Sequence, residues 1–131
     1  MSSLPSGVVC RIKCWLNIGG DFLMGPRYVR LLEGIDATGT IRAACSSTGL
    51  SYRTCVKRIR AMERRLGAPV LSTQRGGATH GHAQLTPLAR RLVRLYRAWR
   101  QQLEAASDRA FRSALRGAVR NSRRTASPRR R

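Results

Sequence analysis

The residues from Thr48 to Gly67, TGLSYRTCVKRIRAMERRLG, limit the possible folds more than any other stretch. Their apolar residues recur at steps of three and four, which is typical of the buried face of an amphipathic helix. These residues are Tyr52, Cys55, Val56, Ile59, Met62 and Leu66. Ser51 is placed to cap the helix and Gly67 to end it. The stretch therefore predicts a helix that packs on a core through one side.

The other side of this predicted helix is basic. Four residues recur along it at the same helical steps: Arg53, Lys57, Arg60 and Arg64. Arg58 and Arg65 flank them, and Glu63 is the only acid in the stretch. The whole chain carries a formal charge of +20, from 26 Lys and Arg against six Asp and Glu. A surplus of this size indicates a polyanionic partner, either nucleic acid or an anionic membrane surface.

The neighbouring sequence predicts two helices before the basic helix and a hairpin after it. Pro26 opens a helix that ends at Gly39, and Thr40 caps a short helix, TIRAACSST. Strand-like segments at 70–73 and 83–86 enclose a Gly-rich loop. This order is typical of a winged helix-turn-helix domain, with the basic helix as recognition helix and the hairpin as wing.

The two ends of the chain add a predicted hairpin and a predicted long helix. Residues 8–18 alternate like a strand, Gly19-Gly20-Asp21 indicates a turn, and residues 22–24 can return as a second strand. Thr86 and Pro87 open a long helix. Its apolar seam comprises Leu88, Leu92, Leu95, Trp99, Leu103 and Ala106. No acid follows Asp108, and we expect disorder from about Gly117 onward.

These patterns predict three parts. Residues 1–24 form an N-terminal segment with a β-hairpin, and residues 25–107 form the winged helix-turn-helix domain with its long helix. Residues 108–131 form an Arg-rich tail, disordered in its distal part. The expected fold class is mostly α with small β.

Four pieces of the chain, in this order, resemble a known family. They are GPRYVRLLEGIDATGTI, the LSYR that opens the basic helix, the RGG…LT of the hairpin, and LTPLARRLVRLYR. Over about residues 15–106 the chain is similar to the N-terminal domain of ModE-type molybdate-responsive regulators, and more distantly to the DNA-binding domain of LysR-type regulators. The resemblance implies a winged helix-turn-helix and a long helix that pairs two subunits. Nothing after that helix resembles the family's molybdate-binding module.

The predicted DNA contacts lie at the start of the basic helix, before it, and on the hairpin. Arg and Lys there can contact phosphates and guanine edges in the major groove. The predicted contacts are Thr40, Ser51, Tyr52, Arg53, Thr54, Lys57, Arg58, Arg60, Arg75, Thr79 and His80. Tyr52 can instead belong to the core. The spacing of His80 and His82 also suits a shared metal ion, although phosphate contact or exposure to solvent is favoured because no carboxylate or thiol lies nearby.

We therefore expect a DNA-binding transcriptional regulator that binds duplex DNA as a homodimer, without its own molybdate-binding module. The residues expected to pair the subunits are Leu88, Leu92, Leu95, Trp99 and Leu103. In a monomer, the same seam can fold back on the N-terminal hairpin. The main alternative function is a sequence-tolerant architectural or nucleoid DNA-binding protein. An RNA-binding accessory protein is less favoured, because only 5% of residues are aromatic.

Other classes of function find no support in the sequence. The acids are scattered, with no convergent pair, no nucleophile elbow and no phosphate-binding Gly loop, so we expect no enzyme and no cofactor or metal. No apolar run approaches the roughly 18–20 residues that span a bilayer, and we identify no signal peptide. The cysteines lack metal-ligand spacing, and Cys45 and Cys55 are expected to pack as small hydrophobic residues in a cytoplasmic protein. An anionic membrane surface stays a minor alternative partner for the tail.

Overall fold

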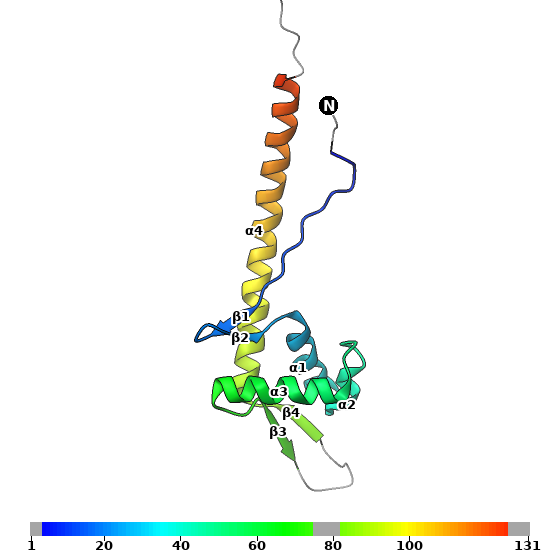
Figure 1. Cartoon of the computed structure of the whole chain (residues 1–131), viewed down its shortest axis with the longest axis vertical. Helices are drawn as coiled ribbons and strands as arrows, with labels where there is room; N and C mark the ends of the chain where they lie inside the picture. The colour runs from blue at the N-terminus through cyan, green and yellow to red at the C-terminus, as the bar shows by residue number, and fades with distance from the viewer. Residues whose placement is uncertain (1–3, 75–81, 126–131) are drawn as a thin grey trace, which may run out of the picture. The chain divides into compact units, whose positions relative to one another are not determined.

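The computed structural model describes residues 4–74 and 82–125. It is mostly helical, with two small antiparallel hairpins and a long C-terminal helix, which confirms the expected coarse class (Figure 1). The elements in chain order are β1 (Leu16–Ile18), β2 (Asp21–Met24), α1 (Pro26–Thr38), α2 (Ile41–Cys45), α3 (Tyr52–Leu66), β3 (Leu71–Gln74), β4 (His82–Leu85) and α4 (Pro87–Thr125). The chain divides into two compact units, Lys13–Trp99 and a second unit made of Met1–Ile12 with Arg100–Arg131.

Helix α1 forms the centre of the Lys13–Trp99 unit. Its fully buried residues are Val29, Leu31, Leu32 and Ile35. Burying side chains of this size contributes about 1.5–3 kcal/mol each. A Cβ on Gly34 would lie 3.0 Å from the Cβ of Ala44 in α2, so the two helices cross closely at this glycine. The packing of α1 therefore sets the position of α2.

Gly39 ends α1 and connects it to the second hairpin. Its φ is +82°, a left-handed conformation that glycine adopts without strain. Its N–H donates to the carbonyl of Ile35 at 2.7 Å, and its own carbonyl accepts from the N–H of Ala83 in β4 at 2.6 Å. The imidazole of His82 lies directly beside the glycine Cα. The end of α1 thus serves as the attachment point for β4.

The hairpin β3–β4 is also joined to α4. Its register pairs Leu71 with Leu85, and Leu85 is buried. The N–H of Thr86 donates to the carbonyl of Val70 at 3.0 Å. The Thr86 hydroxyl accepts from the N–H of Ala89 at 3.3 Å, which makes Thr86 the N-terminal cap of α4. One residue therefore closes the hairpin and starts the long helix.

The first turns of α4 pack on this unit through Tyr96. The ring is fully buried, its hydroxyl donates to the carbonyl of Cys14 at 2.9 Å, and Trp99 meets it edge-on with ring centroids 6.1 Å apart. Two ion pairs, Arg90 with Asp36 and Arg97 with Glu33, add a connection between α4 and α1. Their side chains are 37–49% exposed, so each pair contributes little, about 0–1 kcal/mol.

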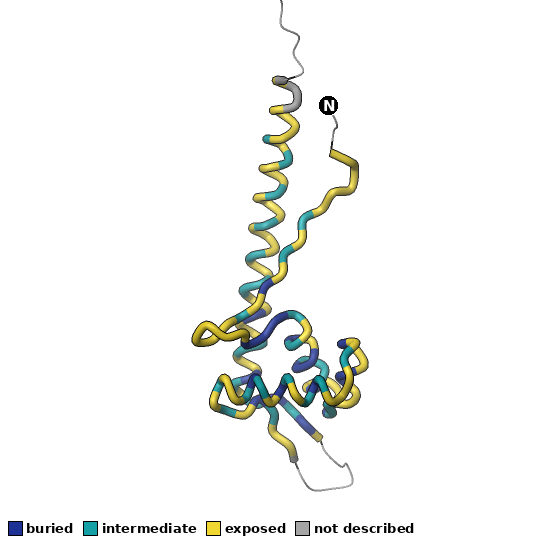
Figure 2. Tube along the Cα trace, viewed as in Figure 1, coloured by how far each residue is buried: buried dark blue, intermediate teal, exposed yellow. Residues whose placement is uncertain are grey.

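The second unit contains no buried residue among those described. Residues 100–121 are all exposed or intermediate, and Figure 2 shows only these two colours along the described distal part of α4. The N-terminal segment of this unit contacts the helix at Cys10, whose thiol donates to the carboxylate of Asp108 at 3.4 Å. This contact is exposed, so no buried core is present among the described residues of this unit.

Two expectations from the sequence differ from the structure. Helix α4 continues to Thr125, whereas disorder was expected from about Gly117. The reason is that Ala and Arg favour helix, and extending an existing helix avoids the cost of nucleation. Strand β1 covers three residues rather than 8–18, because β2 offers only four residues for pairing. The boundaries predicted at residues 24 and 107 stay a prediction.

We predict that Gly39→Ala destabilises the Lys13–Trp99 unit by about 1–3 kcal/mol. The new Cβ would overlap the imidazole of His82, and alanine at a φ of +82° is strained. Urea denaturation followed by circular dichroism measures the effect. The control is Gly117→Ala, at a helical position with open space, which should leave stability unchanged or raise it by up to about 1 kcal/mol. Wild-type stability in Gly39→Ala would contradict this account of the α1 end.

Candidate nucleic-acid interface

The joint between α2 and α3 is held by short side-chain hydrogen bonds. Thr40 caps α2, with its hydroxyl accepting from the N–H of Ala43 at 3.1 Å. In the turn between the two helices, the buried Thr48 donates to the carbonyl of Cys45 at 2.7 Å and accepts from the N–H of Leu50 at 3.3 Å. Ser51 then caps α3. The first turn of α3 is therefore fixed relative to α2.

One side of α3 packs on the core as predicted. Cys55, Ile59 and Met62 are buried, and Val56 and Leu66 are partly buried. Burial is the main cause that raises the pKa of the Cys45 thiol to about 12, and a hydrogen bond with Cys55 adds to it. Since the thiolate is the reactive and metal-binding form, Cys45 stays a neutral thiol at physiological pH. Cys45 and Cys55 are buried as small apolar residues, as expected.

The other side of α3 is exposed and positively charged. Four residues, which we call the α3 basic face, are exposed along it: Arg53, Lys57, Arg60 and Arg64. Figure 2 shows buried and exposed residues alternating along this helix. Among the described residues, no ion pair joins the α3 basic face to a carboxylate. Glu63, the only acid of α3, accepts instead from the backbone N–H of Val70 at 2.9 Å. The positive charge of this face is therefore uncompensated within the described fold.

Two other arginines of α3 are engaged inside the unit. Arg58 lies over the ring of Tyr28, 5.1 Å from its centroid. Arg65 donates to the backbone carbonyl of Phe22, and the rings of Phe22 and Tyr28 meet edge-on at 5.3 Å. These contacts attach α3 to α1 and to the first hairpin. Arg58 was predicted as a DNA contact, and the structure gives it this packing position.

Tyr52 is exposed, so the interpretation of this residue as core is wrong. Its exposed fraction is 45%, and the guanidinium of Arg42 lies over its ring at 4.6 Å from the centroid. Tyr52 occupies the first turn of α3, beyond the buried part of the helix, and Arg42 of α2 covers it. Sequence reasoning missed Arg42. Its signal was a basic residue two positions after the α2 cap, next to the recognition helix.

The other predicted DNA contacts divide between the α3 cap and the hairpin tip. The hydroxyl of Ser51 accepts from the N–H of Thr54 at 3.2 Å and donates to the Thr54 hydroxyl at 2.9 Å. Arg75, Thr79 and His80 lie outside the described residues. Among the residues that are described, no group of three His, Cys, Asp or Glu is arranged to hold a metal ion. No described helix is long and apolar enough to cross a membrane.

Comparison with known proteins finds relatives of the ModE and Mop types. The chain is 41% identical over 73 residues to the molybdenum-pterin-binding protein MopB of Rhodobacter capsulatus, which covers 56% of this chain and 27% of the relative. It is 36% identical over 81 residues to the molybdenum transport protein ModE of Azotobacter vinelandii, which covers 62% of this chain and 30% of that relative. It is 34% identical over 86 residues to the transcriptional regulator ModE of Haemophilus influenzae, which covers 66% of this chain and 32% of that relative.

These matches support the resemblance to ModE-type proteins. The names describe binding, transport and regulatory proteins rather than enzymes. The matched stretch spans 27–32% of the length of these relatives. No family model matches the chain. The more distant resemblance to LysR-type regulators stays a prediction.

The relatives contradict the function expected from the sequence. That expectation was a homodimeric DNA-binding regulator without a molybdate-binding module, with an architectural DNA-binding protein as the alternative. MopB is named for binding molybdenum-pterin, and the ModE of Azotobacter vinelandii for molybdenum transport. These names contradict the expectation of a regulator that lacks a molybdate-binding module. The expectation failed because it relied on the absence of a module from residues that match less than a third of each relative.

Proposed function

We propose that the Lys13–Trp99 unit is the DNA-binding part of a ModE-like regulatory system that responds to molybdenum. The observation that carries this proposal is the α3 basic face, in which four exposed cations lack carboxylate partners among the described residues. The only acid of the same helix is occupied by the N–H of Val70. A helix with a fixed core side and an uncompensated basic side suits the major groove of duplex DNA.

The proposed fold of residues 25–107, most of which lie in this unit, is a winged helix-turn-helix. Helix α3 is the recognition helix, and the residues in its first two turns contact bases, as is usual for this motif. These residues are Arg53, Thr54 and Lys57. Thr40, Ser51 and Tyr52 face phosphates beside them, together with Arg42. The wing is the β3–β4 hairpin, with Arg75, Thr79 and His80 as proposed contacts. The proposed location of the DNA-bound chain is the cytoplasm.

The link to molybdenum rests on the names of the relatives. Since MopB is a molybdenum-pterin-binding protein, we propose that binding of a molybdenum compound changes the DNA binding of the system containing this chain. In this proposal, the described residues bind DNA. A separate module of the system, like those for which the relatives are named, binds the molybdenum compound.

The proposed assembly is a homodimer through α4. Leu95 is 57% exposed, although it lies next to the fully buried Tyr96. Leu88, Leu92, Trp99 and Leu103 are each only partly buried. The hydroxyl of Tyr96 donates to the carbonyl of Cys14 near the start of the unit. The N-terminal segment therefore covers the side of α4 that carries Tyr96 and leaves Leu95 exposed. Pairing with the same seam of a second copy buries it through an isologous contact and presents two recognition helices to successive major grooves.

We predict that Arg53→Ala weakens binding to a preferred site by about 1–3 kcal/mol. The site is first selected by the wild-type protein from a pool of randomised duplexes, and affinities are then measured by fluorescence anisotropy. The charge-matched control is Arg112→Ala on α4, which should weaken selected and random duplexes equally. If Arg53→Ala also affects both duplexes equally, Arg53 contacts only phosphate and the base-reading role of α3 is wrong.

The molybdenum link predicts that occupancy of DNA in cells depends on molybdate. Chromatin immunoprecipitation of this protein measures that occupancy in cells grown with and without molybdate. Sulfate at the same concentration is the control, because it has the same shape and charge. Occupancy should change with molybdate and not with sulfate. Equal occupancy under all these conditions would contradict the link to molybdenum while leaving DNA binding intact.

For the dimer, we predict that Leu95→Arg yields a folded monomer with weaker DNA binding. A charge placed in the seam cannot be buried against its own symmetry copy without a large cost. Sedimentation velocity gives the oligomeric state, and Gln101→Arg adds the same charge at an exposed polar position of α4. Gln101→Arg should sediment as a dimer, like the wild type. A wild-type monomer at micromolar concentration would overturn the dimer proposal.

A further inference from the structure

A second basic surface lies between the β3–β4 hairpin and the start of α4. It is a hollow of about 570 Å³, which we call the Arg hollow, lined by Ser72, Gln84, Leu85, Pro87, Arg90, Arg91 and Arg94. None of these residues belongs to α3 or to the predicted DNA contacts. All of them lie in the Lys13–Trp99 unit. The hollow is therefore a feature separate from the α3 basic face.

The register and the helical spacing bring its polar groups to one place. Ser72 and Gln84 are paired across the hairpin, so their side chains project from the same face of the two strands. Arg91 and Arg94 are three residues apart in α4, so they project from the same side of the helix. A hydroxyl, an amide and the guanidinium groups of Arg91 and Arg94 thus line a single hollow, together with Arg90.

The charges of the Arg hollow are not balanced. Arg90 forms an ion pair with Asp36 at 3.3 Å. Within the described ranges 4–74 and 82–125, no ion pair joins Arg91 or Arg94 to a carboxylate, and no lining residue is acidic. The start of α4 adds the positive end of a helix dipole. Two like charges at this spacing repel each other, and a bound anion would relieve the repulsion.

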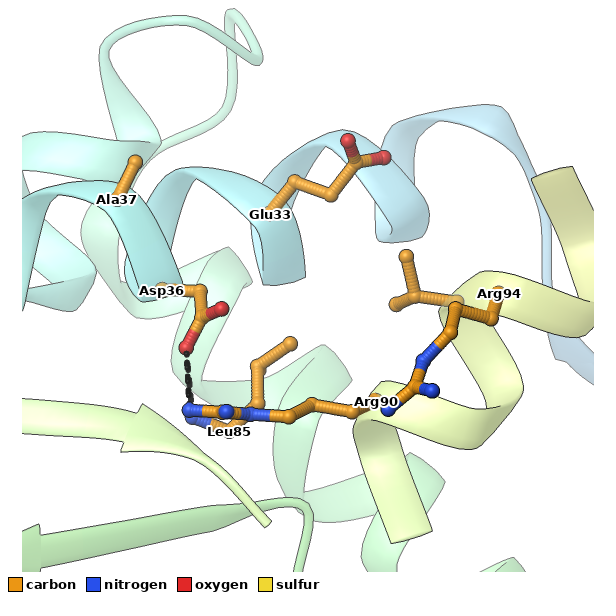
Figure 3. A pocket seen from close by; sticks show the side chains of 7 residues that line it. Glu33, Asp36, Ala37, Leu85, Arg90 and Arg94 are labelled. Carbon is orange, nitrogen blue, oxygen red and sulfur yellow. Dashed lines mark hydrogen bonds and ion pairs between the residues drawn. The ribbon is translucent and has the colours of Figure 1, made fainter. Parts of the chain in front are cut away.

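The adjoining pocket provides an internal comparison. It has a volume of about 390 Å³ and shares Leu85, Arg90 and Arg94 with the Arg hollow, but it also contains Glu33 and Asp36. Figure 3 shows the side chain of Arg90 extending across this pocket to Asp36. The carboxylates of the adjoining pocket repel anions. An anion is therefore expected on the side of Arg91, Ser72 and Gln84.

We propose that the Arg hollow binds a tetrahedral oxyanion of the phosphate class. The planar guanidinium groups of Arg91 and Arg94 donate to its oxygens, as arginine forks do with phosphate. The Ser72 hydroxyl and the Gln84 amide donate to the remaining oxygens. The oxyanion is either a phosphate of a nucleic-acid backbone or a free inorganic ion. The site does not depend on the α3 basic face, so it stands even if α3 binds no DNA.

The test is a titration with sodium phosphate against sodium chloride at constant ionic strength, followed by NMR of the arginine Nε–H groups. The Nε–H signals of Arg91 and Arg94 should shift and saturate. In Arg91→Gln with Arg94→Gln, the affinity for phosphate should fall about tenfold or more, the loss expected for a charge-assisted hydrogen bond. Backbone amide spectra show whether the variant remains folded.

The matched control is Arg109→Gln with Arg112→Gln, which has the same spacing on α4 and the same loss of charge. It should keep the wild-type titration. Shifts that do not saturate, or that are equal at Arg109 and Arg112, would show a diffuse ion atmosphere and overturn the proposal. Adding duplex DNA identifies the source of the oxyanion. Displacement of phosphate by the duplex indicates a backbone phosphate, and an unchanged phosphate titration indicates a free ion.

Discussion

The hydrogen bond from the backbone N–H of Val70 to the carboxylate of Glu63 engages the only acid of α3 and ties this helix to the segment that leads into the β3–β4 hairpin. At 2.9 Å it is a charge-assisted bond between the last turns of the helix and the start of the hairpin. The carbonyl of Glu63 also accepts from the N–H of Gly67 at 2.8 Å, which closes the helix in a left-handed turn. Glu63 therefore ends α3, attaches the hairpin, and removes the only acid of the helix from pairing with its arginines.

The other cations of the unit also divide into those that make contacts inside the fold and those that do not. Some arginines are used for stability, because Arg58 packs on Tyr28, Arg65 bonds to the carbonyl of Phe22, and Arg97 pairs with Glu33. The acids that could balance the rest are few, at six in the whole chain. Among the cations without a carboxylate partner in the described fold are the four residues of the α3 basic face and two arginines of the Arg hollow, Arg91 and Arg94. These two surfaces are where we expect anions to bind.

The sequence predicted the elements whose limits are set by local chemistry. Pro26 and Gly39 mark α1, and Ser51 and Gly67 mark α3, because each acts through its own backbone conformation or cap. It did not predict features that depend on distant residues. The exposure of Tyr52 depends on where the core ends, and the partner of Glu63 is a backbone group seven residues away. The proposed connection to molybdenum rests on the names of the relatives and on the resemblance to ModE-type regulators, because no described residue has chemistry that indicates molybdenum by itself.

The most direct test of the central claim is an NMR titration of the intact chain with a short duplex selected by that chain. Backbone amide shifts report which elements meet the DNA. The account predicts the largest changes from Tyr52 to Arg64 in α3 and around Arg42 in α2, with little change at the buried residues of α1. Changes confined to α4, with the signals of α3 unmoved at saturation, would show that the basic residues of α3 are only a solvated surface and would contradict the account.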